Sequence, residues 1–307
     1  MTEGSSHQPP KGRKAVLSSL CAGAIAGAVA KTTIAPLDRT KINFQVSQTR
    51  GYSFRRALLF LRESWRTEGP LALWRGNSAT MARVVPYAAI QFASHEQWKH
   101  VLHCDMHDST PGRRFIAGSL AGVTAVVCTF PLDSARARMA VSPKCEYWSL
   151  RSVFGKIYTI EGPVALYRGL VPTVAGVVPY AGTSFFTMET LKLLYRKEFN
   201  VQRVPAHYSM MFGAFAGLLG QTASYPLDIV RRRMQTGRGL EGTRSRSILG
   251  ILLFVARTEG VREGLYKGLS MNWIKGPIAV GISFTTYDFV VQQLRLLPIF
   301  RLSDGDR

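Results

Sequence analysis

Six stretches of mainly apolar residues divide the chain, and each is about as long as a helix that crosses a membrane. They cover roughly residues 16–35, 79–98, 115–130, 170–191, 210–225 and 270–291. About 20 apolar residues are needed for a helix to cross the hydrocarbon core of a bilayer. Small and polar residues dilute every stretch. The pattern as a whole predicts an all-α membrane protein with six transmembrane helices.

A short motif recurs three times at a constant interval. It consists of a proline, any residue, an aspartate and a basic residue three places later, and its copies start at 36, 131 and 226, each 95 residues after the previous one. A Gly-xxx-Gly pair precedes every copy, and Glu-Gly followed by an aromatic-basic-Gly triplet comes after it. Markers that recur in phase indicate structural repeats.

The sequence therefore predicts three repeats arranged around a pseudo-threefold axis. We place them at 15–104, 105–204 and 205–298, between a polar, disordered N-terminal tail at 1–14 and a C-terminal tail at 299–307. The glycine pairs are expected to let helices approach closely in lipid. The motif prolines lie inside the odd-numbered stretches and are expected to kink them.

About 40 residues rich in arginine and lysine link the two stretches of each repeat. Their pattern fits a short amphipathic helix, which predicts short helices resting on the membrane surface. Basic links favour one side of a membrane, so all three should face the same compartment and both termini the other.

Each motif places an aspartate and a cation on one helix face. The pairs are Asp38 and Lys41, Asp133 and Arg136, and Asp228 and Arg231. Two arrangements remain open: a bond within each helix, or, where three helix ends converge, a ring in which each aspartate reaches a neighbouring helix. Such a ring closes a pore and can form and break, because buried and solvated ion pairs are nearly balanced in free energy.

Positions that differ between the repeats are candidates for contact with an asymmetric solute. Seven residues before the motif aspartates lie Lys31, Val126 and Gln221. Thirteen residues before the acidic residues of the even-numbered stretches lie Arg83, Gly176 and Lys275. A charge inside a membrane span is costly unless it faces a water-filled cavity or a partner.

We therefore predict that Lys31, Arg83 and Lys275 bind phosphate groups, for which arginine offers a bidentate contact and lysine a point charge. Glycine at 176 leaves room for a flat ring near Val177 and Tyr180. The alternative for the three cations is snorkelling to lipid headgroups. Arg232 lies in the run 231–233, and either it or its neighbour faces the solute or anionic lipid.

Composition limits the possible classes of function but does not identify one. The net charge of +20 implies an anionic partner: nucleic acid, an acidic lipid surface or a phosphorylated small molecule. The four cysteines are scattered without metal-ligand spacing. No catalytic constellation and no nucleotide-hydrolysing Gly-rich loop is present, so the sequence predicts neither an enzyme, nor a cofactor, nor a metal site.

The repeated motif, with its glycine pair before and its aromatic-basic-Gly triplet after, resembles the mitochondrial carrier family over residues 15–298. Within that family, the segments 74–81, 84–92 and 267–281 are similar to carriers of coenzyme A. The resemblance implies a monomeric multi-pass protein of the mitochondrial inner membrane, with bound cardiolipin and termini in the intermembrane space. It implies exchange of coenzyme A or dephospho-coenzyme A for adenine nucleotides such as ADP or adenosine 3′,5′-diphosphate.

The resemblance also assigns roles. It places the ring of ion pairs at the matrix side. Gln45 and Gln235 brace the ring in the first and third repeats, and Ala140 occupies the equivalent place in the second. It places a second gate at the cytoplasmic side. That gate has Glu96 with Lys99 and Glu189 with Lys192, but Asp288 is followed by Val291, so we expect a weaker gate there.

Two rival functions remain open at this point. Carriers of other phosphorylated nucleotides, such as ADP/ATP or ATP-Mg/phosphate exchangers, would share the predicted cations. A soluble, basic helical-repeat protein that binds nucleic acid would need a polar exterior on the six apolar stretches, which their composition disfavours.

Overall fold

The computed structural model describes residues 13–48, 52–103, 111–143, 146–202, 204–238 and 247–296, and these residues form helices and turns without a strand. They divide into two compact units, one made of Met1–Ala35 with Ile274–Arg307 and the other of Pro36–Trp273. The predicted tails at 1–14 and 299–307 fall outside the described residues, except that α1 already begins at Arg13.

Six long helices coincide with the six apolar stretches. They are α1 (Arg13–Val46), α3 (Asn77–Val101), α4 (Pro111–Val141), α6 (Leu170–Phe199), α7 (Ala206–Thr236) and α9 (Leu269–Leu296). The shortest has 25 residues, which at about 1.5 Å per residue exceeds the roughly 30 Å of a bilayer core. Two helical stretches, Gly112–Val141 and Pro163–Phe199, are apolar enough to satisfy a simple hydropathy test.

The motif prolines do not end their helices. Pro36, Pro131 and Pro226 lie inside α1, α4 and α7, which continue for at least ten residues beyond them. Each odd helix therefore carries its motif aspartate and cation on regular helical backbone. The hydroxyl of Thr40 donates to the carbonyl oxygen of Pro36 at 2.9 Å, close to the point where the proline has removed a donor.

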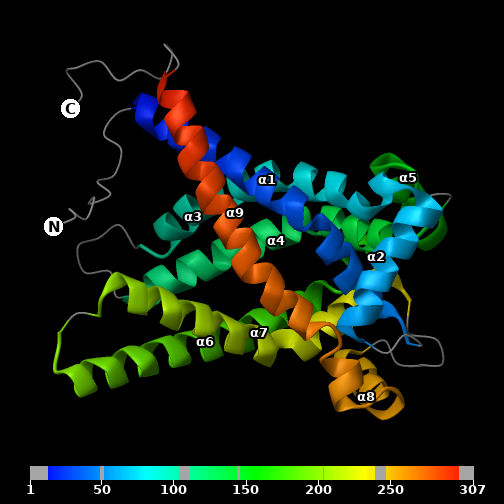
Figure 1. Ribbon diagram of the computed structural model, residues 1–307. Coiled ribbons are helices and arrows are strands. Elements are labelled where there is room, and N and C mark those ends of the chain that lie inside the picture. The colour runs from blue at the N-terminus through cyan, green and yellow to red at the C-terminus, as the bar shows by residue number, and fades with distance from the viewer. Residues whose placement is uncertain are drawn as a thin grey trace. The chain divides into compact units, whose positions relative to one another are not determined.

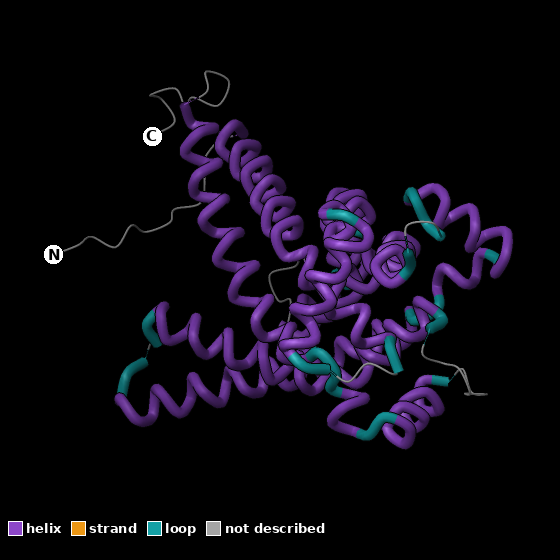
Figure 2. Tube along the Cα trace, turned by 45° about the vertical axis from the view of Figure 1, so that its right-hand side comes forward, coloured by secondary structure: helices purple, strands orange, loops and turns teal. Residues whose placement is uncertain are grey.

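Within the second unit, the helices pair across the repeat boundaries. α3 lies beside α4 and α6 lies beside α7, as Figures 1 and 2 both show. In the first unit, the N-terminal part of α1 runs beside the C-terminal part of α9. Each even helix thus packs on the odd helix of the following repeat, and the third repeat pairs with the first.

The expected role of the glycine pairs is wrong in the second unit. A Cβ atom added at Gly118, Gly122 or Gly217 would meet nothing within 4 Å, so these glycines leave space open. The close approach is at Gly220, where a Cβ would lie 2.8 Å from the carbonyl oxygen of Tyr180. Small residues permit close packing but do not compel it.

Short helices form the links, as the basic and amphipathic pattern predicts. They are α2 (Phe54–Glu68) with the turn η1 (Pro70–Trp74), α5 (Leu150–Lys156) with η2 (Ile157–Glu161) and η3 (Pro163–Tyr167), and α8 (Ile248–Thr258) with η4 (Val261–Leu265). Ser149 and Ser247 cap the starts of α5 and α8 through their side chains. The surface of α2 leaves Leu58, Leu59 and Trp65 exposed, which suits a helix that rests on lipid.

Large apolar side chains are exposed on the spanning helices. Val85 and Phe92 of α3 are both 70% exposed, and Phe186 of α6 is 74% exposed. Such surfaces suit contact with lipid tails and are unfavourable in water. They count against the soluble nucleic-acid-binding protein considered above.

The aromatic-basic-Gly triplet ends in a glycine because the backbone requires one. Gly76 and Gly169, at the starts of α3 and α6, have φ angles of +86° and +92°. A Cβ would lie 3.0 Å from the carbonyl oxygen of Arg136 in the first case and 2.9 Å from that of Arg231 in the second. Each even helix therefore begins directly against the motif cation of the next repeat.

Replacing Gly169 with alanine is expected to lower the Tm of the purified protein in detergent. The left-handed backbone alone costs a side chain roughly 1–3 kcal/mol, and the contact with Arg231 adds to it. Gly162→Ala is the matched control, since its φ is +82° but a Cβ there meets nothing within 4 Å. The prediction is wrong if Gly169→Ala melts no lower than Gly162→Ala.

Candidate functional site

The motif residues form ion pairs between helices. Arg136 of α4 bonds to Asp38 of α1, Arg231 of α7 bonds to Asp133 of α4, and Lys41 Nζ lies 2.9 Å from Asp228 Oδ2. Each aspartate thus meets the cation of another repeat, and the three pairs close a cycle around the ends of α1, α4 and α7. Of the two arrangements left open by the sequence, the structure has the ring.

Two glutamines support the ring. Gln45 donates to Asp228 Oδ2 at 3.0 Å and to the hydroxyl of Tyr225 at 3.2 Å, while Gln235 donates to Asp133 Oδ2 at 3.1 Å. Both glutamine side chains are fully buried. Ala140 occupies the equivalent position in the second repeat and has no side-chain donor.

A second cycle of arginines lies next to the ring, and it was not predicted from the sequence. Each arginine binds the glutamate of its own repeat's Glu-Gly marker: Arg39 with Glu68, Arg138 with Glu161 and Arg233 with Glu259. Each also donates through Nε to the next repeat, at the carbonyl oxygens of Ala140, Gln235 and Gln45 respectively. Two of these main-chain positions, Gln235 and Gln45, also brace the ring with their side chains.

The links contribute further contacts to this layer. Lys267 donates to the carbonyl oxygen of Ser47 at 2.6 Å, and its burial lowers its pKa although Glu259 lies 3.4 Å away. Hydrogen bonds from Arg138 hold the pKa of Glu161 below its usual value. Charged side chains therefore tie each link to the ends of the odd helices.

A cavity of about 440 Å³ opens directly onto the ring. It is lined by Lys41, Arg83, Val126, Asp133, Arg136, Pro172, Thr173, Gly176, Val177, Tyr180, Gln221, Ser224, Tyr225, Asp228, Arg231, Arg232 and Asn272. Five of the lining residues are cations and two are carboxylates, so the lining carries excess positive charge. Such a site favours an anionic occupant.

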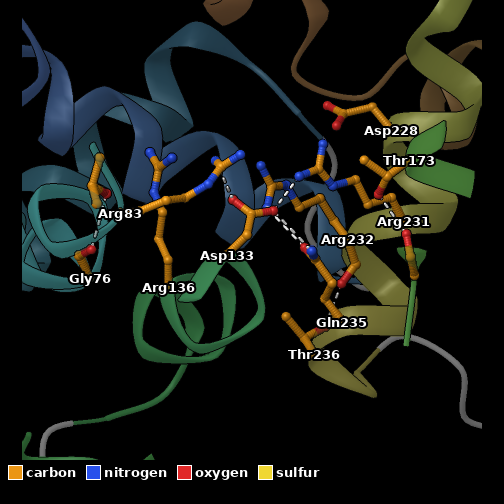
Figure 3. A network of polar contacts seen from close by, with 12 residues as sticks. Gly76, Arg83, Asp133, Arg136, Thr173, Asp228, Arg231, Arg232, Gln235 and Thr236 are labelled. Carbon is orange, nitrogen blue, oxygen red and sulfur yellow. Dashed lines mark hydrogen bonds and ion pairs between the residues drawn. The ribbon is translucent and has the colours of Figure 1, made fainter. Parts of the chain in front are cut away.

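Asp133 is the most crowded residue of the ring. Besides Arg231, it pairs with Arg83 at 3.3 Å and with Arg232 at 3.7 Å, while its side chain is only 2% exposed. Figure 3 shows these arginines around Asp133. Arg83 also donates to Thr129 at 3.3 Å and lies 5.0 Å from the ring centroid of Tyr87. The cation excess of the cavity is therefore concentrated around one shared carboxylate.

The predicted substrate residues of the second unit share this cavity. Arg83, Gly176, Val177, Tyr180 and Arg232 all belong to its lining. Val126 and Gln221, the symmetry equivalents of Lys31, line it as well. Lys31 on α1 and Lys275 on α9 belong to the first unit, so their part in the site remains a prediction.

The acidic residues of the even helices pair locally. Glu96 lies 3.1 Å from Lys99 on α3, and Glu189 lies 3.7 Å from Lys192 on α6. Both glutamate side chains are more than 60% exposed. Asp288 belongs to the first unit, so the second gate also remains a prediction. In the part of the chain that the structure describes, no group of three or more His, Cys, Asp or Glu is placed to hold a metal ion.

Comparison with known proteins agrees with this architecture. The family model described as mitochondrial carrier protein matches residues 12–106, 107–199 and 202–296. The chain is 54% identical over 301 residues to a Xenopus tropicalis protein named mitochondrial coenzyme A transporter, covering 97% of this chain and 91% of that protein.

Two further relatives are similar over most of their length. The human protein of the same name is 55% identical over 298 residues, which are 95% of this chain and 93% of the relative. Mouse solute carrier family 25 member 16 is 42% identical over 296 residues, which are 91% of this chain and 89% of the relative.

The three matched segments cover nearly the whole chain and confirm the predicted fold class. They also confirm the predictions of a transporter rather than an enzyme, and of a multi-pass protein of the mitochondrial inner membrane. The chain belongs to the mitochondrial carrier family.

Proposed function

We propose that this carrier moves coenzyme A, or dephospho-coenzyme A, in exchange for adenine nucleotides such as ADP or adenosine 3′,5′-diphosphate. The observation that carries the proposal is the cavity on the ring, with its surplus of cations. The names of the Xenopus and human relatives support coenzyme A as the solute. Coenzyme A and the adenine nucleotides share an adenine ring and phosphate groups, so one cavity can serve both.

The cavity offers different chemistry on its different walls. Arg83 and Arg232 provide guanidinium groups for phosphates, while Gly176, Val177 and Tyr180 on α6 provide a largely apolar wall with space for the flat base. In this assignment Lys31 and Lys275 add two further cations from α1 and α9. Gates can be the same in all three repeats, but an asymmetric solute needs contacts that differ between them.

Exchange requires the ring to open and close around a bound solute. The closed ring described above is one end state of alternating access, with the cavity ending at the ion pairs. Phosphates that bind Arg83 and Arg232 compete with Asp133 for the same cations, which weakens the hold of the ring when solute is present. In the opposite state we assign closure to Glu96, Lys99, Glu189, Lys192 and Asp288. Asp288 has Val291 at the position where the other two acidic residues have a lysine, so we expect one ion pair fewer and a weaker second gate.

We assign the carrier's remaining partners on the same basis. We propose a monomer as the working unit. The basic links and the exposed apolar residues of α2 suit anionic lipid such as cardiolipin. The ring then faces the matrix, the termini face the intermembrane space, and no nucleic acid is involved.

Exchange in liposomes tests the proposal. The purified chain is reconstituted into vesicles that are loaded with ADP, and uptake of radiolabelled coenzyme A is compared with uptake into empty vesicles. We expect uptake that depends on internal ADP and is inhibited by external adenosine 3′,5′-diphosphate. Uptake that is indifferent to coenzyme A but exchanges ATP or ATP-Mg for phosphate would assign the chain to another substrate class.

A further inference from the structure

A chain of hydrogen bonds runs from the ring to the wall of the cavity. Lys41 Nζ donates to Asn272 Oδ1 at 3.3 Å, and Asn272 Nδ2 donates to Gln221 Oε1 at 2.7 Å. All three side chains line the cavity. Lys41 is also the ring partner of Asp228, so the chain begins at a charged group with a fixed position.

The chemistry of this chain fixes the orientation of both amides. An ammonium group only donates hydrogen bonds, so Asn272 must turn its oxygen toward Lys41. Its NH₂ group then faces Gln221, which must present its own oxygen in return. Amide groups are otherwise free to flip by 180° with little change in shape. Here Gln221 is left with Nε2 as a donor and one lone pair of Oε1 as an acceptor, in fixed places.

Gln221 lines the same cavity as the apolar wall of α6 that we assign to the adenine base. At its neighbour Gly220, α7 lies close to α6, since an added Cβ would be 2.8 Å from the carbonyl oxygen of Tyr180. Tyr180, Val177 and Gln221 line the same cavity. Among the described residues, Nε2 of Gln221 has no hydrogen-bond partner in the protein. A donor and an acceptor side by side thus belong to a residue that lines the same cavity as Val177 and Tyr180.

We propose that Gln221 is the residue that distinguishes adenine from 6-oxopurines, and that Asn272 is its positioning residue. This inference rests on the proposed function, because it concerns the base of the same nucleotide substrates. Adenine carries a donor at N6 next to an acceptor, which is N1 on one edge and N7 on the other. Both edges match the fixed acceptor and donor of Gln221.

A 6-oxopurine such as hypoxanthine does not match. Its O6 accepts where adenine donates, so it meets the lone pair of Oε1. A freely rotating glutamine would flip and bind the edge formed by O6 and N1–H, but the bond from Asn272 prevents that rotation. The discrimination therefore depends on both amides.

The symmetry of the repeats argues against a purely structural role for this amide. The equivalent position in the second repeat is Val126, which lines the same cavity with an apolar side chain. A polar group is therefore not needed there to complete the fold. The amide at 221 is a difference between the repeats, as a contact with an asymmetric solute requires.

Competition between ADP and inosine diphosphate tests the inference. Unlabelled ADP and inosine diphosphate are compared as inhibitors of the uptake of labelled ADP into ADP-loaded liposomes. A good bidentate contact predicts that ADP inhibits about tenfold more strongly. Gln221→Met removes the amide, and Asn272→Leu allows Gln221 to rotate. In both variants the preference should collapse toward equal inhibition. Thr222→Val is the matched control, because its hydroxyl bonds to Leu218 of the same helix outside the cavity lining.

A second variant reduces the preference for ADP while keeping the shape of the side chain. Gln221→Glu keeps the shape and the acceptor for Asn272 but replaces the donor by a second acceptor, which suits N1–H of hypoxanthine. Inosine diphosphate should therefore gain on ADP. Should a variant not transport, the rise in Tm of the purified protein with each nucleotide gives the same comparison.

The possible results separate the inference from the proposed function. A wild-type carrier without preference for ADP, or variants that keep the wild-type preference, would overturn the role of Gln221. Failure of coenzyme A to exchange, with the ADP preference intact and lost in Gln221→Met, would overturn the proposed substrate and leave this base contact standing.

Discussion

Replacing Asp133 with asparagine is expected to have the largest effect of any single change in the ring. Asp133 pairs with Arg231, Arg83 and Arg232 and is almost fully buried. Its loss leaves three cations together without the carboxylate that they share, and breaking a buried ion pair on one side typically costs about 3–5 kcal/mol. We expect a large fall in the Tm of the purified protein in detergent and loss of exchange in liposomes.

Asp228→Asn is the matched comparison. Among the described residues Asp228 has a direct ion pair only with Lys41, and its side chain is 24% exposed. Its removal should therefore lower the Tm less than the removal of Asp133. Equal losses at the two positions would mean that sharing by three arginines adds nothing.

Replacing Arg83 with alanine is expected to abolish exchange while the protein still inserts into the membrane. Arg83 lines the cavity, and the loss of one charged hydrogen bond to a phosphate corresponds to roughly 1.5–3 kcal/mol, about a 10- to 150-fold loss of affinity. Uptake of coenzyme A into ADP-loaded liposomes measures the effect. Arg83→Lys keeps the charge without the bidentate fork and should retain part of the activity.

Arg151→Ala serves as the control for general loss of positive charge. Arg151 lies on the link helix α5, is exposed and is outside the cavity lining. It should leave exchange unchanged. Normal rates in Arg83→Ala would show that the solute binds elsewhere.

The ring could be predicted from the sequence because its residues recur in all three repeats. Because Asp38, Asp133 and Asp228 recur in phase with their cations, one hypothesis about a threefold arrangement covered all six residues. Symmetry also brought Arg83 and Gly176 to one level, and both line the cavity. The positions of repeated residues can be predicted from their spacing, since equivalent residues of the three repeats occupy equivalent places in the fold.

Features that depend on how helices pack were not predictable in this way. The bond between Arg83 and Asp133 exists because α3 lies beside α4, and nothing in the spacing of residues 83 and 133 indicates it. The close contact at Gly220 could not be predicted because it is a single glycine outside the repeated pair. Glu68 belongs to the repeated Glu-Gly marker, but its partner Arg39 lies at a different offset from the motif proline than Arg138 and Arg233 do, so spacing does not predict the second cycle.

The pairing of each even helix with the next repeat has a consequence for how the chain matures. A single repeat is not a self-sufficient folding unit, because the partner of its even helix has not yet been synthesised. The partner of α1 is α9, so the first segment to be made waits for the last. Contacts that join distant parts of a chain form slowly. Truncation near the C-terminus therefore removes the packing partner of the N-terminal part of α1.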